Sequence, residues 1–113
     1  IKDLKVSSHL LIKRDGGITQ FVPFNKRAWH AGISSYDGVD NCNDYSIGIE
    51  LEGADNSEFT DQQYNCLMKI TKSLLLNYPN LRKERIVGHS TIAPNRKTDP
   101  GPFFNWLKLL DNL

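Results

Sequence analysis

The residue types best suited to metal chemistry gather in segment 88–102, which contains His89, Lys97 and Asp99. A neutral imidazole and a carboxylate are good ligands for a catalytic zinc ion, and an ammonium beside them could stabilise an oxyanion. Because Asp99 precedes a proline, extended backbone is expected there, with Lys97 and Asp99 pointing to the same side. The same residues could instead be a surface histidine, a solvated lysine and an aspartate that caps a turn. The spacing by itself leaves both interpretations open.

Glu50 is the carboxylate best placed to act as a general base. Residues 46–52 alternate between apolar and polar, which predicts a strand. Glu50 shares the polar face with Gly48, whose missing side chain leaves space for a ligand or a metal-bound water. A glutamate beside such a water can take its proton. Alternatively, Glu50 and Glu52 occupy a solvated sheet face, as antiparallel sheets often do.

A binding function is suggested by Trp29 and His30, which lie in a long loop expected at 25–43. Aromatic rings pack on apolar faces of sugars or peptides, and an imidazole gives a directed hydrogen bond. The alternative is that Trp29 anchors the loop and the backbone satisfies His30. His9 leads an apolar strand and is expected to be a hydrogen-bonded core residue, not a ligand.

Four strands are predicted to form the sheet that positions these residues. Apolar runs at 9–13 and 18–22 flank an Asp-Gly-Gly sequence, which supplies the positive φ angles of a hairpin turn. The alternating residues 46–52 and a short run at 85–88 predict two further strands. The last of them would lead directly into His89.

Two helices are expected to accompany these strands. Thr60 and Gln63 match a capping box in front of apolar residues at helical spacing, and Pro79 ends that helix. Pro102 suits the first turn of a last helix with an apolar stripe. The pattern indicates an α/β fold, with a small mixed β-sheet flanked by helices.

Length and composition restrict the class of protein. A chain of 113 residues allows one core, so residues 1–113 are expected to form one domain. The net charge of +1 comes from basic residues spread along the chain, which argues against nucleic acid or a membrane as partner. Cys42 and Cys66 form no C-x-x-C pair, and a reduced cytoplasmic protein is favoured over one with a disulfide.

Four segments, taken together, resemble the N-acetylmuramoyl-L-alanine amidase type 2 family, and within it the cytoplasmic AmpD branch. The segments that fit the family pattern, in order, are 7–16, 22–32, 43–53 and 88–102. The resemblance implies a zinc-dependent enzyme that cuts the amide bond between the lactyl group of N-acetylmuramic acid and L-alanine. It also implies that the substrate is a recycled 1,6-anhydro-muropeptide.

The resemblance implies a role for individual residues as well. His89 and Asp99 would be zinc ligands. Glu50 would be the general base, and Lys97 would stabilise the oxyanion. The substrate contacts would come from a set of aromatic and basic residues, namely Trp29, His30, Lys5 and Arg96.

A third zinc ligand of the family, a histidine, is expected upstream of Ile1. Catalytic zinc normally takes three protein ligands, so the resemblance predicts a gene product longer than these 113 residues. Residues 1–113 alone are expected not to form a competent enzyme. We expect a monomer that binds muropeptide. The alternative is a non-catalytic domain that binds peptidoglycan fragments and has an incomplete zinc site.

Overall fold

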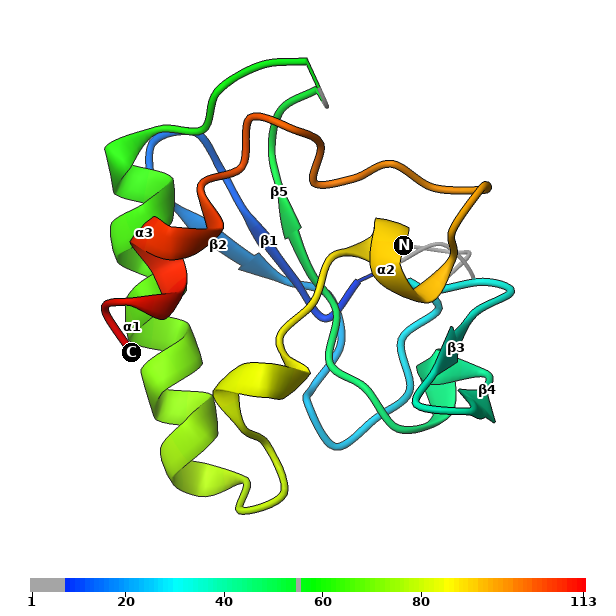
Figure 1. The fold of residues 1–113 in the computed structure, drawn as a ribbon. Coiled ribbons are helices and arrows are strands. Elements are labelled where there is room, and N and C mark those ends of the chain that lie inside the picture. Colours follow the sequence, from blue (N-terminus) through cyan, green and yellow to red (C-terminus); the bar gives the residue numbers. More distant parts are fainter. Residues whose placement is uncertain (1–7, 55) are drawn as a thin grey trace.

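The computed structural model describes residues 8–54 and 56–113. Figure 1 shows the arrangement of its helices and strands. The elements, with η for 3-10 helix, are β1 (Leu10–Ile12), β2 (Ile18–Gln20), β3 (Ser35–Tyr36), β4 (Val39–Asp40), η2 (Cys42–Asp44), β5 (Ile49–Leu51), α1 (Asp61–Asn77), η3 (Lys83–Arg85), α2 (His89–Ile92) and α3 (Trp106–Leu110).

The larger sheet is mixed, as the sequence predicts. Its strand order is β2-β1-β5, with β1 antiparallel to β2 and parallel to β5. The hairpin between β1 and β2 closes where the amide of Lys13 donates to the carbonyl of Gly17 over 2.8 Å. Gly16 takes a φ of 87° in this turn, a conformation that glycine adopts without a steric penalty.

Helix α1 begins with the predicted capping box. The hydroxyl of Thr60 accepts from the amide of Gln63 over 3.1 Å, and Gln63 Oε1 accepts from the amide of Thr60 over 3.0 Å. Gln63 Nε2 also donates to the carbonyls of Ile12, at 3.2 Å, and Glu52, at 2.9 Å. One buried side-chain amide therefore ties the start of the helix to the ends of β1 and β5.

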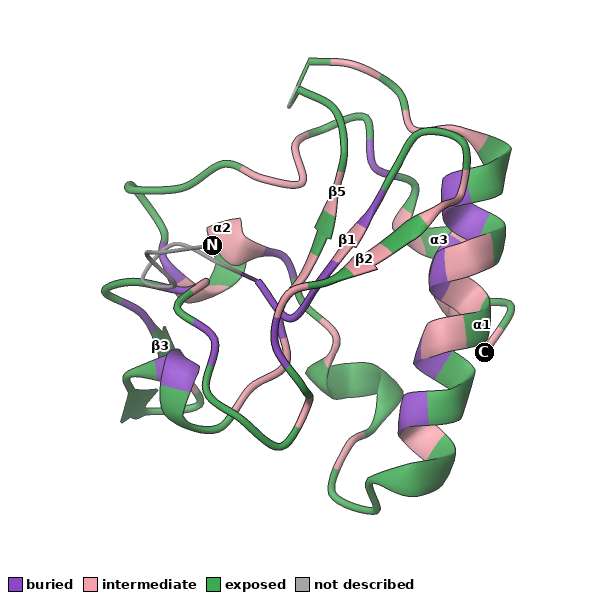
Figure 2. Ribbon diagram, turned by 180° about the vertical axis from the view of Figure 1, so that it is seen from behind, coloured by how far each residue is buried: buried purple, intermediate pink, exposed green. Residues whose placement is uncertain are grey.

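Helices α1 and α3 lie together on one side of the sheet and form the core with β1 (Figure 1). Buried and half-buried residues follow the inner side of α1 (Figure 2). Ile49 and Leu51 of β5 pack against this core, which confirms the predicted apolar face of that strand. The buried residues of the cluster are Ile12, Tyr64, Leu67, Phe104 and Leu109.

The structure corrects two predictions, namely the strand at 85–88 and the start of the last helix. Residues 85–88 do not form a strand, because Arg85 and Ile86 donate their amides to the carbonyls of Arg82 and Lys83 and close a 3-10 turn. The last helix begins at Trp106 and not near Pro102. Its N-cap is Asn105, whose side chain accepts from the amide of Lys108 over 3.0 Å.

The expected loop at 25–43 contains a second, two-stranded sheet of β3 and β4. Its turn is formed by Asp37 and Gly38, with φ of 51° and 78°. Positive φ at both central residues is the conformation that closes two-residue hairpins and that Asp-Gly favours. The sequence therefore carried a local signal for this hairpin inside a segment without periodicity.

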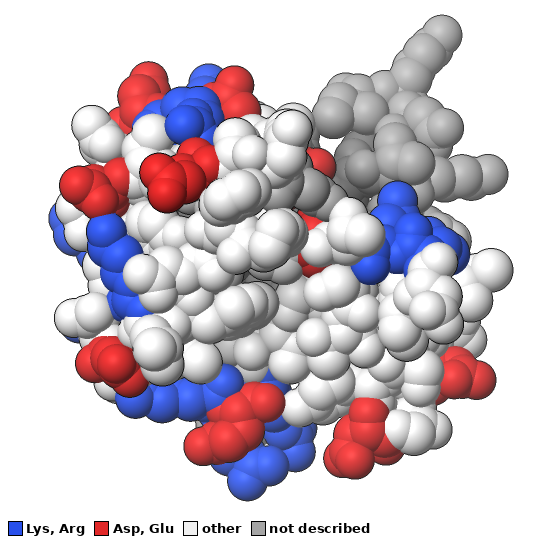
Figure 3. All heavy atoms as spheres, turned by 45° about the horizontal axis from the view of Figure 1, so that its top comes forward, with Lys and Arg blue, Asp and Glu red and all other residues white. Residues whose placement is uncertain are grey.

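The surface carries both signs of charge. In Figure 3, acidic and basic side chains lie close together along the left and lower rim, whereas the centre of this face is mainly uncharged. Among the described residues, no helix combines the length and the apolar character that crossing a membrane requires.

Candidate functional site

His89 and Asp99 come together at one point. Nδ1 of His89 lies 3.3 Å from Oδ2 of Asp99, and the two side chains are 17% and 49% exposed. His89 opens the short helix α2, and Asp99 lies at the end of the segment that returns from it. A histidine and a carboxylate thus share an accessible position.

Backbone packing brings these two residues together. The amide of Ser90 donates to the carbonyl of Asp99 over 3.0 Å. Gly88 admits the close approach, since a Cβ at that position would lie 2.7 Å from Cδ of Pro100 and 3.3 Å from the carbonyl oxygen of Asp99. A glycine in front of the histidine is therefore a steric requirement of this arrangement.

The hydrogen bonds of His89 define which ring nitrogen is free. Its Nε2 lies 2.8 Å from the carbonyl oxygen of Ala31, which can only accept, so Nε2 carries the proton. In the neutral ring Nδ1 then presents its lone pair on the side of Asp99. Metal-ligating histidines commonly donate their other ring nitrogen to a carbonyl in this way.

His30 fills the space beside Gly48. A Cβ on Gly48 would lie 2.4 Å from Cγ of the His30 ring. The expectation that this space would hold a ligand or a metal-bound water is therefore wrong. The missing side chain of Gly48 instead lets an imidazole pack against the strand.

The His30 ring has one nitrogen that is buried and lacks a hydrogen-bond partner. Ser46 donates its hydroxyl to the carbonyl of Cys42 at 2.6 Å, so His30 Nε2, at 2.9 Å from that hydroxyl oxygen, is the donor. Nδ1 of His30 is then an acceptor, buried and without a hydrogen-bond partner. Burial, followed by the nearby His9 and His89, lowers the pKa of His30 from 6.5 to about 4. The ring is therefore neutral at pH 7.

His9 is a core residue, as expected. It is 1% exposed, its Nε2 donates to the carbonyl of Lys26 over 2.7 Å, and its Nδ1 accepts from the amide of Gly48 over 3.1 Å. Both ring nitrogens are satisfied by the backbone.

Asn43 organises the loop that carries His30, and the sequence analysis did not identify it. Its buried Oδ1 accepts from the amides of His30, at 3.0 Å, and Ala31, at 2.8 Å. Asparagine is common in loops, so composition gave no signal for this function. The contact fixes the backbone whose carbonyl holds His89.

The remaining predicted residues lie on different elements. Glu50 is exposed at the centre of β5, where it pairs with Leu11 of β1. Lys97 is exposed in the segment that precedes Asp99. Its backbone amide donates to the carbonyl of Ala93 and closes a turn. The structure thus places the pair His89 and Asp99 together and leaves the chemistry of Glu50 and Lys97 a prediction.

The predicted substrate contacts have different surroundings. Trp29 is 39% exposed, and the guanidinium carbon of Arg27 lies 4.1 Å from the centre of its ring. The Arg96 guanidinium donates to the carbonyls of Ala31 and Ile33. Lys5 lies outside the described residues.

No group of three histidine, cysteine, aspartate or glutamate side chains that could hold a metal occurs in the described part of the chain. His89 and Asp99 are therefore a pair in this part. Both cysteines are free, Cys42 buried and Cys66 half-buried.

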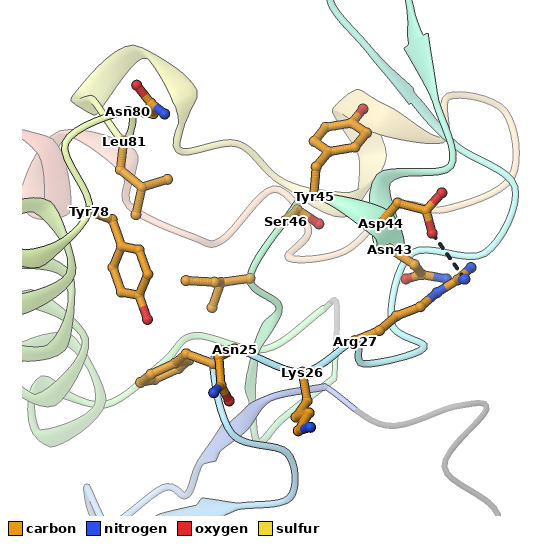
Figure 4. Close-up of a pocket in the computed structure, with 12 residues that line it drawn as sticks. Asn25, Lys26, Arg27, Asn43, Asp44, Tyr45, Ser46, Tyr78, Asn80 and Leu81 are labelled. Carbon is orange, nitrogen blue, oxygen red and sulfur yellow. Dashed lines mark ion pairs between the residues drawn. The ribbon is translucent and has the colours of Figure 1, made fainter.

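A separate hollow of about 340 Å³ lies beside the segment that leads into β5. Figure 4 shows Tyr78 and Asn25 on one side of it and the ion pair of Arg27 and Asp44, 3.0 Å long, on the other. None of the residues expected to act in catalysis, metal binding or substrate binding lines it.

Sequence comparison identifies the family. The profile of the N-acetylmuramoyl-L-alanine amidase family matches residues 1–102. The chain is 57% identical over 106 residues to the 1,6-anhydro-N-acetylmuramyl-L-alanine amidase AmpD of Salmonella typhimurium (strain SL1344). This match covers 94% of the chain and 56% of the relative, so the chain spans little more than half of that relative's length.

Solved structures agree with this result. A selenomethionine derivative of AmpD superposes with a TM-score of 0.92 at 55% identity, over 96% of this chain and 60% of the other. The amidase AmiD from E. coli, in complex with anhydro-N-acetylmuramic acid-L-Ala-D-γ-Glu-L-Lys, superposes with a TM-score of 0.90 at 37% identity, over 97% and 49% of the two chains. The fold is the small mixed α/β fold of these amidases. The chain belongs to the N-acetylmuramoyl-L-alanine amidase family.

Proposed function

We propose that this protein is a zinc-dependent amidase, which hydrolyses the bond between the lactyl group of N-acetylmuramic acid and L-alanine in 1,6-anhydro-muropeptides. The names of its relatives support the substrate class, since AmpD is a 1,6-anhydro-N-acetylmuramyl-L-alanine amidase and AmiD is found with an anhydro-muramyl peptide. The single observation that carries the proposal is the pairing of His89 with Asp99.

The geometry of this pair suits zinc. Ligand atoms about 2.0–2.2 Å from a tetrahedral zinc ion lie roughly 3.3–3.6 Å from each other. Nδ1 of His89 and Oδ2 of Asp99 are 3.3 Å apart. Nε2 donates to Ala31, which leaves Nδ1 as the ligand atom. Catalytic zinc normally takes three protein ligands, and the described residues place no third His, Cys, Asp or Glu beside this pair.

Zinc bound at this pair would supply a Lewis acid and lower the pKa of a bound water molecule. In the proposed mechanism, a carboxylate oxygen of Glu50 accepts the proton of the attacking water and passes it to the leaving amine of L-alanine. The Nζ ammonium of Lys97 stabilises the negative charge that develops on the carbonyl oxygen. Exposure of both side chains leaves them accessible to a substrate.

Substrate binding is proposed for the loop that carries Trp29 and His30. The guanidinium of Arg27 covers one face of Trp29, so the indole can present its other face to the sugar or peptide. His30 is retained as a proposed substrate contact on the resemblance, since its Nδ1 is buried in the protein. Lys5 is retained as a proposed contact on the resemblance alone.

We place this activity in the cytoplasm. Two free cysteines fit a reducing compartment, where thiols are kept reduced. A recycled muropeptide is also a small soluble substrate.

The test uses the protein expressed from its complete gene. We expect about one zinc ion per chain, and release of the peptide from 1,6-anhydro-N-acetylmuramyl-L-Ala-γ-D-Glu, detected by mass spectrometry. A chelator should abolish hydrolysis and added zinc should restore it. A zinc-loaded protein that binds this substrate but never cleaves it would contradict the proposal and support the non-catalytic binding domain.

A further inference from the structure

One backbone carbonyl is shared by the candidate zinc ligand and an arginine. The oxygen of Ala31 accepts from Nε2 of His89 at 2.8 Å and also from Nη2 of Arg96. A carbonyl oxygen has two lone pairs, so it can accept both hydrogen bonds. Arg96 therefore contacts the group that orients the ring of His89.

The guanidinium also holds the next part of this loop. Nη2 and Nε of Arg96 donate to the carbonyl of Ile33 at 3.0 and 3.3 Å. Asn43, which precedes β5 in the chain, holds the same loop. Its side-chain oxygen accepts from the backbone amides of His30 and Ala31. The Ala31 peptide is thus fixed at its N–H by Asn43 and at its C=O by Arg96.

Gly32 makes room for this contact. Its φ is 64°, and a Cβ there would lie 2.7 Å from Nη2 of Arg96. Ala31 is fully buried, so the loop cannot move outward without exposing a core residue. The carbonyl, the glycine and the arginine form one tightly packed unit.

We propose that Arg96 is a positioning residue of the metal site. By fixing the Ala31 carbonyl, it keeps the proton of His89 on Nε2 and aims Nδ1 at the position shared with Asp99. This inference rests on the proposed zinc site. It differs from the expectation that Arg96 binds substrate, because the guanidinium donors are directed to the protein's own backbone.

The experiment measures the zinc dissociation constant of the protein from its complete gene, by competition with a chromophoric chelator. Arg96→Ala should weaken zinc binding about 10- to 100-fold, the usual effect of losing a partner that orients a ligand. Arg96→Lys should recover part of the affinity, because an ammonium lacks the planar fork that spans two carbonyls. Gly32→Ala, which keeps the arginine but displaces it, should weaken binding in the same direction.

Two matched controls separate this effect from general destabilisation. Arg14→Ala removes another arginine that donates to a backbone carbonyl, that of Glu58, at 2.7 Å. Gly38→Ala introduces the same positive-φ strain, at 78°, where no atom lies within 4 Å of the new Cβ. Both should bind zinc as the unaltered protein does, and thermal unfolding of the zinc-free variants should confirm that each is folded.

The outcomes distinguish the hypotheses. Unchanged zinc affinity in folded Arg96→Ala, with a raised KM for muropeptide, would overturn the inference. It would show that Arg96 binds substrate. Equal losses in Arg96→Ala and the controls would overturn it as well. A protein that binds no zinc before any substitution would overturn the proposed function itself.

Discussion

Nδ1 of His89 lies 3.3 Å from Oδ2 of Asp99, while the backbone of Asp99 accepts a hydrogen bond from the residue that follows His89. The two side chains are therefore positioned by backbone contacts that do not depend on a bound ion. This arrangement is preorganised, which matters because a ligand pair that must be assembled by the metal binds it more weakly.

The roles of Asp99 and Lys97 can be separated by zinc content. Asp99→Ala should strip zinc from the protein, since it removes a ligand atom. Lys97→Ala should retain zinc and lose turnover, because an ammonium acts here as a charge and not as a ligand. Atomic absorption and amidase assays on both variants check this. Equal zinc loss in the two would contradict separate roles.

Glu50→Ala should keep zinc and lower the turnover roughly 10²–10⁴-fold, because it removes the proposed general base. Glu52→Ala is the matched control. Glu52 accepts from the backbone amide of Arg14 at 2.8 Å, so its loss should affect stability and not catalysis. Steady-state kinetics decide between them. Loss of turnover in Glu52→Ala alone would show that Glu52, and not Glu50, is the general base.

Gly88→Ala should weaken zinc binding about tenfold and cost about 1–3 kcal/mol of stability. The new Cβ would lie 2.7 Å from Cδ of Pro100, which must shift and carry Asp99 with it. Zinc competition and urea denaturation measure the two effects. Wild-type affinity in this variant would show that the Asp99 side chain adjusts without its backbone.

His30 should make the metal-free protein less stable in acid. Its pKa is 6.5 as a free group and about 4 in the folded protein, so between these values the unfolded chain binds the proton more readily. The contribution of His30 to the free energy of unfolding is therefore fully present above pH 6.5 and is lost as the pH falls toward 4. Solvent screening at this partly exposed ring limits the loss to about 2 kcal/mol.

Urea denaturation between pH 7 and pH 4 checks this prediction. His30→Gln should flatten this part of the profile, because glutamine does not titrate while its amide can still donate to Ser46. Identical profiles for the two proteins would exclude His30 as the source of the acid sensitivity.

Gln63→Leu should destabilise the protein by about 1–3 kcal/mol, because it removes the side-chain donor to the carbonyl of Glu52 and one of the two donors to the carbonyl of Ile12. Gln62→Leu, on the exposed side of the same helix, is the control and should change stability by less than about 0.5 kcal/mol. Urea denaturation of both variants measures the difference. Equal effects would mean that the buried amide contributes nothing specific.

Local sequence patterns were sufficient for the main elements of the fold. The capping box of Thr60 and Gln63, the helical spacing after it and the glycine-rich turn before β2 are interactions between near neighbours. Their energetics depend on the residues themselves, so they can be read without a structure. The pairing of His89 with Asp99 was also suggested by types and spacing, because both residues lie in one short motif.

The tertiary structure alone decided the contacts between distant segments. No pattern in the sequence indicates that His30 fills the space beside Gly48, or that Ala31 offers one carbonyl to both His89 and Arg96. These contacts depend on where separate loops pack and on which lone pairs then face which donors. The prediction of a strand at 85–88 was wrong for a related reason. A short run of residues does not show whether a neighbouring strand is there to pair with it.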